Sequence, residues 1–344
     1  MLRGTVPSGA VATNTTFVEV TPWEVEPLTQ ASGEIPDVAT TFLSGRLDEH
    51  LGEVGHTEVL STFIHSRVDA KALAAMPNLK LFATRSTGFD HIDRATCAER
   101  GIAVVNVPTY GENTVAEHTF ALILALSRKL IAAEQKGRRA DFDLDGLQGF
   151  DLRGKTLGLV GAGRIGLHVV RMARAFGMQV VVSDPQREDL LAEVLHFEYV
   201  DLDELLARSH VVSLHAPANA HTHHLIDADA LGKMLPGALL VNTARGALVD
   251  TEALIAALES GQLGGAGLDV FEGEEHIGED VELLAEGGSE GLRQALGRRL
   301  LADRDDVILT PHNAFNSVEA VQRIAQTTAE NIAAFLRGEP QNLV

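Results

Sequence analysis

The chain of 344 residues is 45% hydrophobic with a mean hydropathy of +0.06, which indicates a globular protein large enough for two domains. The chain has 48 acidic residues and 28 lysines and arginines, which give a net charge of −20. This charge argues against nucleic acid or an anionic membrane as a partner. The single cysteine, Cys97, excludes an intrachain disulfide and any multi-cysteine metal site. It fits a reducing cytoplasm, and we expect it to pack in a core.

At the start of the chain we expect no signal peptide. Residues 1–14 contain one arginine and several small residues, without an apolar stretch long enough for a signal peptide, so we expect a loose leader. No run of about 18 apolar residues occurs along the chain, and we therefore expect no membrane span and a cytoplasmic location.

The first hundred residues alternate short apolar runs with polar helical stretches, which predicts an α/β domain. The expected strands are 16–20, 39–43, 59–64, 79–83 and 102–107, and the expected helices are 69–75 and 91–99. Two of these strands lead into polar loops, 85–90 and 107–113. Ligands of α/β sheets gather beyond the carboxyl ends of the strands, so both loops are candidate substrate contacts, with plain turns as the alternative.

A strongly apolar helix is expected over residues 113–130, and its composition predicts that it is buried and crosses between domains. The following stretch, 141–154, is rich in glycine and aspartate and is predicted to be a loop.

Residues 156–184 have the order of a dinucleotide-binding unit: strand, glycine turn, helix, strand and acid. In it, Gly161 permits the tight turn, Gly163 lets the backbone approach a pyrophosphate, and Gly166 lets the helix pack on the strand. Asp184 ends the second strand, where its carboxylate can accept bonds from ribose hydroxyls and repel a 2′-phosphate. The pattern predicts NAD rather than NADP, although glycines alone also mark ordinary turns.

Beyond Asp184 the alternation continues, as expected for a parallel doubly wound sheet. Helices are predicted at 201–207, 228–234 and 251–260, and strands at 211–214, 238–242 and 265–270. The histidines of the segment 221–224 suggest a metal site, but the sequence places no carboxylate or thiol cluster beside them. We therefore expect no bound metal.

Three predicted strand ends carry residues suited to chemistry. Arg245 follows the strand 238–242, where its planar guanidinium can grip a carboxylate at two points. Asp269 lies at the end of the next predicted strand, with Glu274 a few residues further into the loop, and His312 follows a strand that starts at Val307. Each residue alone is readily explained by a surface salt bridge or a structural histidine, but the combination at neighbouring strand ends indicates an active site.

Four ordered motifs together resemble the D-isomer-specific 2-hydroxyacid dehydrogenases: residues 161–166, 242–246, 269–274 and 311–312. The D-lactate dehydrogenase branch is the most similar, because 85–90, 107–110 and 312–315 also look like that branch. The resemblance runs from about Val59 to Leu336. The first fifty-odd residues match it only loosely.

The resemblance implies an α/β fold of two doubly wound parallel-sheet domains, a Rossmann cofactor domain and a flavodoxin-like substrate domain. Residues 1–108 plus 311–344 would form the discontinuous substrate domain, and 109–310 the NAD-binding domain. It also implies a homodimer formed through the cofactor domain, in which the helix from Asn113 is a candidate contributor.

The resemblance also implies roles for individual residues. Arg245 would bind the substrate carboxylate and polarise its carbonyl, His312 would donate the proton, and Glu274 would pair with His312. Substrate contacts would come from Thr87, Gly88, Tyr110 and Phe315. Cofactor contacts would come from Gly161, Gly163, Arg164, Ile165, Gly166, Asp184, Ala216, Pro217, Thr222, Thr243 and Asp269.

The expected reaction is reduction of pyruvate or a similar 2-oxoacid by NADH. Hydride addition puts negative charge on the carbonyl oxygen, which His312 and Arg245 are suited to stabilise. Two alternatives stay open: an NAD(H)-sensing binding protein or corepressor on the same fold, and a dehydrogenase for another small anion. The acidic insert 275–304 is either a solvated excursion or a helix pair beside the active site.

Overall fold

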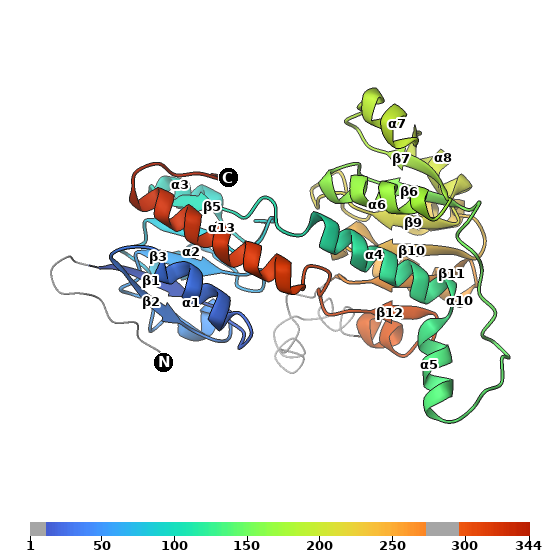
Figure 1. Ribbon diagram of the computed structural model, residues 1–344, viewed down its shortest axis with the longest axis horizontal. Helices are drawn as coiled ribbons and strands as arrows, with labels where there is room; N and C mark the ends of the chain where they lie inside the picture. Colours follow the sequence, from blue (N-terminus) through green and yellow to red (C-terminus); the bar gives the residue numbers. More distant parts are fainter. Residues whose placement is uncertain (1–11, 273–295) are drawn as a thin grey trace. The chain divides into compact units, whose positions relative to one another are not determined.

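The computed structural model describes residues 12–272 and 296–344. The chain divides into two compact units, a smaller one of Met1–Tyr110 with Asn316–Val344 and a larger one of Gly111–Phe315 (Figure 1). The chain therefore leaves the smaller unit once and returns to it for its last helix.

Among the described residues, the smaller unit contains a five-stranded parallel sheet with the strand order β2-β1-β3-β4-β5. The strands are β1 (Thr13–Phe17), β2 (Val38–Phe42), β3 (Val59–Thr62), β4 (Leu81–Thr84) and β5 (Ala103–Val105). The helices are α1 (Val25–Gly33), the 3₁₀ helix η1 (Leu47–His50), α2 (Ala70–Ala74), α3 (Arg94–Glu99) and α13 (Val318–Leu336).

Helices cover both faces of this sheet (Figure 1). α1 and α13 pack beside each other on one face, where Ile332 of α13 is buried with Phe17 and Leu81 of the sheet. α2 and α3 cover the other face, and Cys97 of α3 is fully buried there, as predicted. That burial also raises the pKa of its thiol.

The larger unit contains a seven-stranded parallel sheet with the strand order β12-β11-β10-β9-β6-β7-β8, counted over the described part of the unit. The strands are β6 (Thr156–Val160), β7 (Gln179–Ser183), β8 (Glu198–Tyr199), β9 (Val211–Leu214), β10 (Ala238–Asn242), β11 (Leu263–Leu268) and β12 (Val307–Leu309). The named helices are α4 (Glu112–Ser127), α5 (Leu130–Arg138), α6 (Arg164–Ala175), α7 (Asp189–Leu195), α8 (Leu202–Arg208), α9 (Ala228–Lys233), the 3₁₀ helix η2 (Gly246–Leu248) and α10 (Thr251–Glu259).

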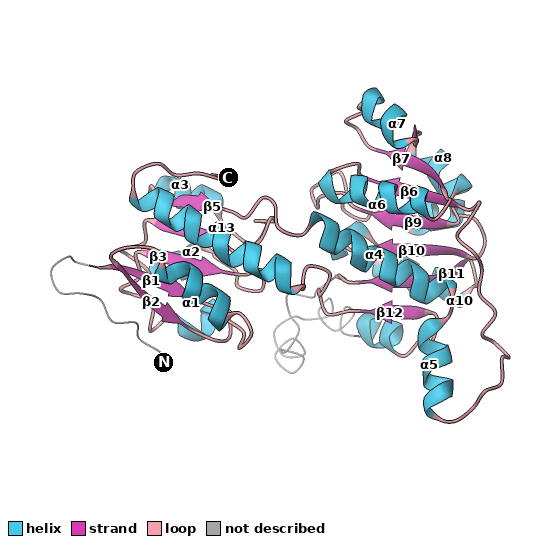
Figure 2. Ribbon diagram, viewed as in Figure 1, coloured by secondary structure: helices cyan, strands magenta, loops and turns pink. Residues whose placement is uncertain are grey.

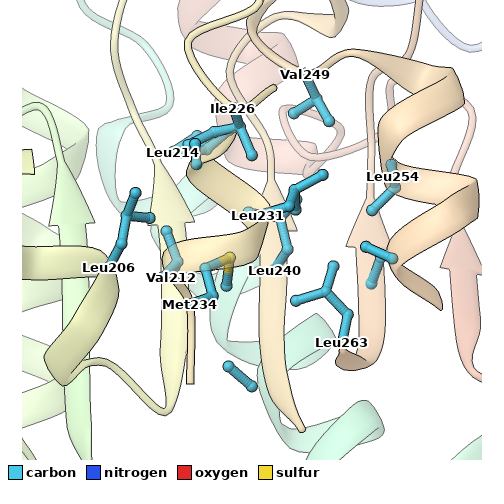
Figure 3. Close-up of a cluster of buried hydrophobic side chains, with 14 of the residues drawn as sticks. Leu206, Val212, Leu214, Ile226, Leu231, Met234, Leu240, Val249, Leu254 and Leu263 are labelled. Carbon is cyan, nitrogen blue, oxygen red and sulfur yellow. The ribbon is translucent and has the colours of Figure 1, made fainter. Parts of the chain in front are cut away.

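The sheet of the larger unit lies between two layers of helices (Figure 2). Alternate residues of each central strand face opposite layers, as the two-residue period of a strand requires. Along β10, Leu239 and Val241 pack with α4 and α6, whereas Leu240 packs with α8, α9 and α10. Figure 3 shows this second layer, where Leu231 of α9 and Met234, the residue after that helix, lie over the strands. Burial on both faces explains why β9 and β10 are uninterrupted apolar runs.

The predicted fold class, α/β with two parallel sheets, is confirmed, but several element boundaries differ. The helix predicted over 113–130 is two helices, α4 and α5, because the chain turns at Lys129, whose φ of 48° is left-handed. α1, α7 and β8 were not predicted from the sequence. Residues 141–154 contain no helix or strand, as predicted. Among the described helices, none has the length and hydropathy needed to cross a membrane.

Candidate active site

The carboxyl ends of parallel strands meet at one edge of a sheet, and in the larger unit six of these ends carry predicted functional residues. β6 leads into the glycine turn, β7 into Asp184, and β9 into Ala216. β10 leads into Arg245, β11 into Asp269, and β12 into His312. The topology therefore gathers residues that lie up to about 150 positions apart in the chain along a single edge.

The glycine turn after β6 has the geometry that its predicted role requires. Gly161 has a φ of +97°, and a Cβ atom there would lie 2.8 Å from the carbonyl of His215. A Cβ on Gly166 would lie 2.3 Å from the carbonyl oxygen of Gly161, so this residue sets how closely α6 packs on β6. A Cβ on Gly163, in contrast, would meet open space. The backbone is thus exposed at the point where a pyrophosphate would approach.

Helix α6 begins at Arg164 and Ile165, directly after this turn, and no side chain caps its start. The N–H groups at a helix start and the helix dipole favour an anion. Together with the open space at Gly163, this end of α6 fits a dinucleotide pyrophosphate.

Asp184, the residue after β7, is tied to the same turn. Its Oδ2 accepts a hydrogen bond from the backbone N–H of Ala162 at 2.7 Å, and its Oδ1 accepts one from the N–H of Gln186 at 2.7 Å. Each carboxylate oxygen keeps a further lone pair, and the residue is partly exposed. The carboxylate is therefore fixed in place while still able to bind a ribose hydroxyl.

The end of β9 supplies a histidine that the site prediction omitted. The ring of His215 is desolvated beside the glycine turn, and this burial lowers its pKa to about 3. The ring Nε2 and the Ser213 hydroxyl lie 2.8 Å apart. Ala216 and Pro217 follow, and the hydroxyl of Thr222 donates to the carbonyl of Pro217 at 2.6 Å. This bond joins Thr222 to the start of the loop that follows β9.

The turn after β10 is shaped by Asn242, whose buried amide donates to the carbonyl of Arg245 at 2.8 Å and accepts from the N–H of Ala244 at 3.0 Å. Arg245 is half-buried, and its Nη1 donates to the carbonyl of Ala244 at 2.7 Å. A Cβ on the next residue, Gly246, would lie 2.2 Å from the carbonyl carbon of Phe271. The loops after β10 and β11 are therefore packed backbone against backbone.

The ends of β11 and β12 are joined through a buried carboxylate. Asp269 has no exposed surface, and its oxygens accept from the Thr310 hydroxyl at 2.5 Å and from the N–H groups of Asn313 at 2.7 Å and Ala314 at 2.9 Å. His312 lies between these donors, and its own N–H donates to the carbonyl of Asp269 at 2.9 Å. Its φ is +50°, a left-handed conformation that is uncommon for a residue other than glycine.

Arg245 and His312 follow the strands on either side of β11. Neighbouring strands lie about 4.8 Å apart, so the two backbones are separated by roughly 10 Å. Long side chains at that spacing can reach a common small molecule. Phe315, predicted to line the substrate pocket, lies in the same unit and is partly exposed.

The predicted substrate contacts of the smaller unit also lie at strand ends. The Thr87 hydroxyl donates to the carbonyl of Val107 at 2.9 Å, which joins the loop after β4 to the loop after β5. The Ser86 hydroxyl donates to the carbonyl of Gly88 at 2.6 Å. The carbonyl of Tyr110 accepts from the Arg323 side chain of α13 at 2.6 Å. These hydrogen bonds fix the positions of Thr87, Gly88 and Tyr110 within the smaller unit.

Buried Arg85, in the loop after β4, bonds to the residues that follow β1. It has no exposed area and donates through Nη2 to the carbonyls of Val18 and Glu19, each at 3.0 Å. Burial lowers the pKa of its guanidinium, an effect opposed by the nearby carboxylates of Glu24 and Glu19. The sequence motif 85–90 included Arg85, but its sequence context did not reveal its structural role.

Glu274, the predicted partner of His312, lies outside the described residues. Most of the acidic insert 275–304 lies outside them as well. Its described end, residues 296–302, is helical, and Leu301 packs into the core of the larger unit beside α10. This end of the insert is therefore part of the fold rather than a solvated excursion.

The structure brings together one group that sequence reasoning did not connect. His223, His224 and Glu272 place potential metal ligand atoms within 4.8 Å of one another, so a carboxylate does lie beside the histidines of 221–224. Protein groups already satisfy that carboxylate: Glu272 pairs with His224 Nε2 at 2.6 Å and accepts from the N–H and hydroxyl of Thr251. Their separation of 48 residues concealed this contact in the sequence.

Comparison with known proteins agrees with this geometry. Residues 120–314 match the family model described as D-isomer specific 2-hydroxyacid dehydrogenase, NAD binding domain. The chain is 38% identical to a D-lactate dehydrogenase of Escherichia coli, over 77% of this chain and 79% of that protein. It is also 38% identical to a glyoxylate reductase of Thermofilum pendens, over 85% of this chain and 82% of that protein.

Among solved structures, the chain is similar to the D-lactate dehydrogenase from Aquifex aeolicus complexed with NAD and lactic acid. The two share 36% identity with a TM-score of 0.86, over 96% of this chain and 99% of the other. The similarity thus covers both units.

Proposed function

The chain belongs to the D-isomer specific 2-hydroxyacid dehydrogenase family, and we propose that within it the protein reduces pyruvate or a similar small 2-oxoacid to the D-2-hydroxyacid. The family assignment makes it an NAD-dependent oxidoreductase. The observation that carries the proposal is the placement of Arg245 and His312 after the two strands that flank β11, at the edge that holds the glycine turn.

In this proposal the bound dinucleotide supplies the hydride that reaches C2 of the oxoacid. Arg245 holds the substrate carboxylate with its planar guanidinium and orients the carbonyl group. His312 donates a proton to the carbonyl oxygen as negative charge develops there, and it accepts the hydroxyl proton in the reverse direction. Glu274 would favour the protonated imidazole and orient its ring.

The cofactor contacts proposed are those of the larger unit. Gly161 and Gly166 shape the turn, and Gly163 leaves room for the pyrophosphate at the start of α6, where Arg164 and Ile165 lie. Asp184 would bind the adenosine ribose, and its fixed carboxylate supports a preference for NAD over NADP. Residues 216–217, Thr222 and Thr243 would complete the contacts. Asp269, which follows β11, would contact the nicotinamide side of the cofactor.

The smaller unit would supply the remaining substrate contacts, from Thr87, Gly88 and Tyr110, and would correspond to the substrate domain of 1–108 plus 311–344. Support comes from its discontinuous composition, with its final helix contributed by the end of the chain. Phe315 would face the side chain of the oxoacid and limit its size.

Glyoxylate is the second candidate substrate, because relatives named glyoxylate reductase match the chain at an identity close to that of the D-lactate dehydrogenases. The two acids differ by the methyl group of pyruvate. One methyl group in an apolar pocket changes specificity by about 10- to 200-fold, so the preference is measurable.

The test is NADH oxidation, followed by absorbance, with pyruvate, glyoxylate, phenylpyruvate and branched 2-oxoacids. We expect rapid oxidation with pyruvate or another small oxoacid, and little with His312→Asn. NADH binding without turnover on any oxoacid would overturn the proposal and favour an NAD(H)-sensing binding protein. Turnover confined to glyoxylate would identify the second candidate.

We also propose that the protein is a homodimer formed through its larger unit. Phe142 and Leu144 lie in the segment that follows α5 and are 82% and 79% exposed, and Leu130 and Ile131 of α5 are exposed as well. Apolar side chains grouped in this way mark a protein interface. Light scattering after size exclusion should show a dimer that Leu144→Asp weakens. Val318→Asp, at a valine of the smaller unit that is 71% exposed, serves as the control.

A further inference from the structure

A chain of hydrogen bonds runs from helix α4 to the loop that carries His312. Nε2 of His118 lies 3.1 Å from the hydroxyl oxygen of Thr310, and that hydroxyl lies 2.5 Å from Oδ1 of Asp269. Asp269 in turn accepts from the N–H groups of Asn313 and Ala314. The chain thus joins both flanks of His312 to a helix whose first residue is Glu112, far away in sequence.

The direction of each bond follows from the groups that make it. An ionised carboxylate only accepts, so the single proton of the Thr310 hydroxyl points to Asp269. The Thr310 oxygen is then free to accept, and Nε2 of His118 must carry the proton that it receives. The arrangement therefore selects the Nε2–H form of His118 when the ring is neutral. His118 Nε2 also lies 3.5 Å from Oδ1 of Asp269, which adds attraction when the ring is charged.

The His312 backbone needs this support. Its φ of +50° lies in the left-handed region, which is unfavourable for a residue that carries a side chain. Such conformations persist where surrounding bonds determine them, and they cluster at functional sites. Here the N–H groups on the carboxyl side of His312 both donate to one buried carboxylate, so moving that carboxylate would move the imidazole.

Asp269 is therefore occupied in a way that the sequence did not suggest. Its side chain is buried, and three donors from residues 310–314 bind its two oxygens. These contacts give Asp269 a task in holding the His312 loop, in addition to the cofactor contact proposed for it.

We propose that His118, acting through Thr310 and Asp269, is a positioning residue that holds His312 in place for proton transfer. The inference rests on the proposed role of His312 and adds a residue outside the motifs that suggested that role. A second hydrogen bond also joins α4 to a strand end of the site. The Thr119 hydroxyl lies 2.9 Å from that of Thr243, so α4 also holds the turn after β10.

Two replacements break the chain of hydrogen bonds at different points, and a third keeps it as a control. His118→Leu removes the donor, Thr310→Val removes the hydroxyl at nearly constant shape, and Thr310→Ser keeps the hydroxyl. Misplacing a catalytic group by about 1 Å costs on the order of 100-fold, so we expect kcat with the best oxoacid to fall about 10- to 100-fold in the first two variants. The KM for NADH should change less than about twofold, and Thr310→Ser should keep most of the activity.

A spectroscopic measurement separates this proposal from the proposed function. In ¹⁵N-histidine-labelled protein, the ring signals of His312 are identified by their loss in His312→Asn. We expect Thr310→Val to shift these signals and Thr310→Ser to return them towards their wild-type positions. His223→Leu, which changes an exposed histidine of the same unit, should leave them in place.

The possible outcomes are distinct. Wild-type protein that reduces no oxoacid removes the proposed function, whereas the His312 signals still test the chain of bonds. Unshifted His312 signals in both His118→Leu and Thr310→Val would overturn the inference. A rise in the KM for NADH that matches the loss of kcat would also overturn it, because the network would then serve the cofactor.

Discussion

Oδ2 of Asp184 lies 2.7 Å from the backbone nitrogen of Ala162, so the acid at the end of β7 is bonded to the glycine turn after β6. Two parts of the dinucleotide motif that are 22 residues apart therefore hold each other. The carboxylate has a structural task besides the recognition of ribose. Replacements of Asp184 must be designed with both tasks in mind.

Asp184→Asn should reduce the preference for NAD over NADP. The amide keeps one acceptor oxygen for the turn, but it loses the negative charge that repels a 2′-phosphate. We expect the ratio of kcat/KM values for NADH and NADPH to fall by at least about 10-fold, as one lost charge interaction of roughly 1.4 kcal/mol implies. A ratio equal to that of the wild type would show that Asp184 does not meet the ribose.

His312→Asn should lower kcat by about 10²–10⁴-fold, the usual contribution of a general acid, while NADH binding stays intact. Asparagine is the preferred replacement because it tolerates the left-handed φ of +50°. His312→Ala should show a similar loss and an additional drop in stability. Steady-state kinetics and NADH fluorescence titration measure the two effects, and exposed His56 supplies a His→Ala control. Undiminished turnover in His312→Asn would remove His312 as the acid.

Arg245→Lys should raise the KM for the oxoacid and lower kcat, because an ammonium cannot make the two-point contact of a guanidinium. It also cannot reproduce the bond from Nη1 to the carbonyl of Ala244 in the same geometry. We expect kcat/KM to fall about 100-fold, equivalent to the 1.5–3 kcal/mol of a charge-assisted bond. Kinetic constants with pyruvate and glyoxylate test it, and values like those of the wild type would place the carboxylate elsewhere.

Gly246→Ala should destabilise the larger unit. The new methyl group would lie 2.2 Å from the carbonyl carbon of Phe271, and backbone atoms can give way only by moving both loops. Overpacking of this kind costs about 1–3 kcal/mol. Gly232→Ala is the matched control, because its Cβ meets open space within α9 and should stabilise the helix by up to about 1 kcal/mol. Urea unfolding of both variants should give opposite signs.

His215 should make the protein less stable in mild acid. The unfolded chain binds a proton at this residue near the ordinary pKa of 6.5, whereas the folded protein does so only near 3. Between these values the unfolded state holds more protons, so stability falls by about 1.4 kcal/mol for each unit that the pH drops. His215→Gln should lose this slope. Unfolding free energies at pH 7 and pH 5 measure it, and an unchanged slope would mean that the ring titrates in the folded state.

Apolar runs that are bounded by turn residues made the centre of the fold predictable. β9 and β10 have the predicted boundaries, because burial on both faces demands hydrophobic residues at every position. β1 lies three residues earlier than predicted, because its first residues are Thr13 and Asn14 rather than apolar ones. α1 was missed for a related reason: Pro27 and Gly33 suggest a turn, although proline is tolerated in a first helical turn.

The candidate site was predictable where one strand end carries its own signal, as at Arg245 and the glycine turn. Contacts between distant segments were not. Nothing in the sequence near His118 points to Thr310, which lies 192 residues away. Nothing near His224 points to Glu272, which lies 48 residues away. The left-handed backbone of His312 is also set by the bonds around it rather than by its neighbours in sequence.

The composition of the smaller unit has a consequence for how the protein is made. α13 supplies Ile332 to the core under β1 and β4, and Asn331 donates to the carbonyl of Asn106 at 2.8 Å. Strands β1 to β5 are synthesised before the larger unit, and α13 is synthesised after it. During synthesis the larger unit can therefore fold before the smaller one, and the sheet face that α13 covers stays exposed to chaperones until α13 has been translated.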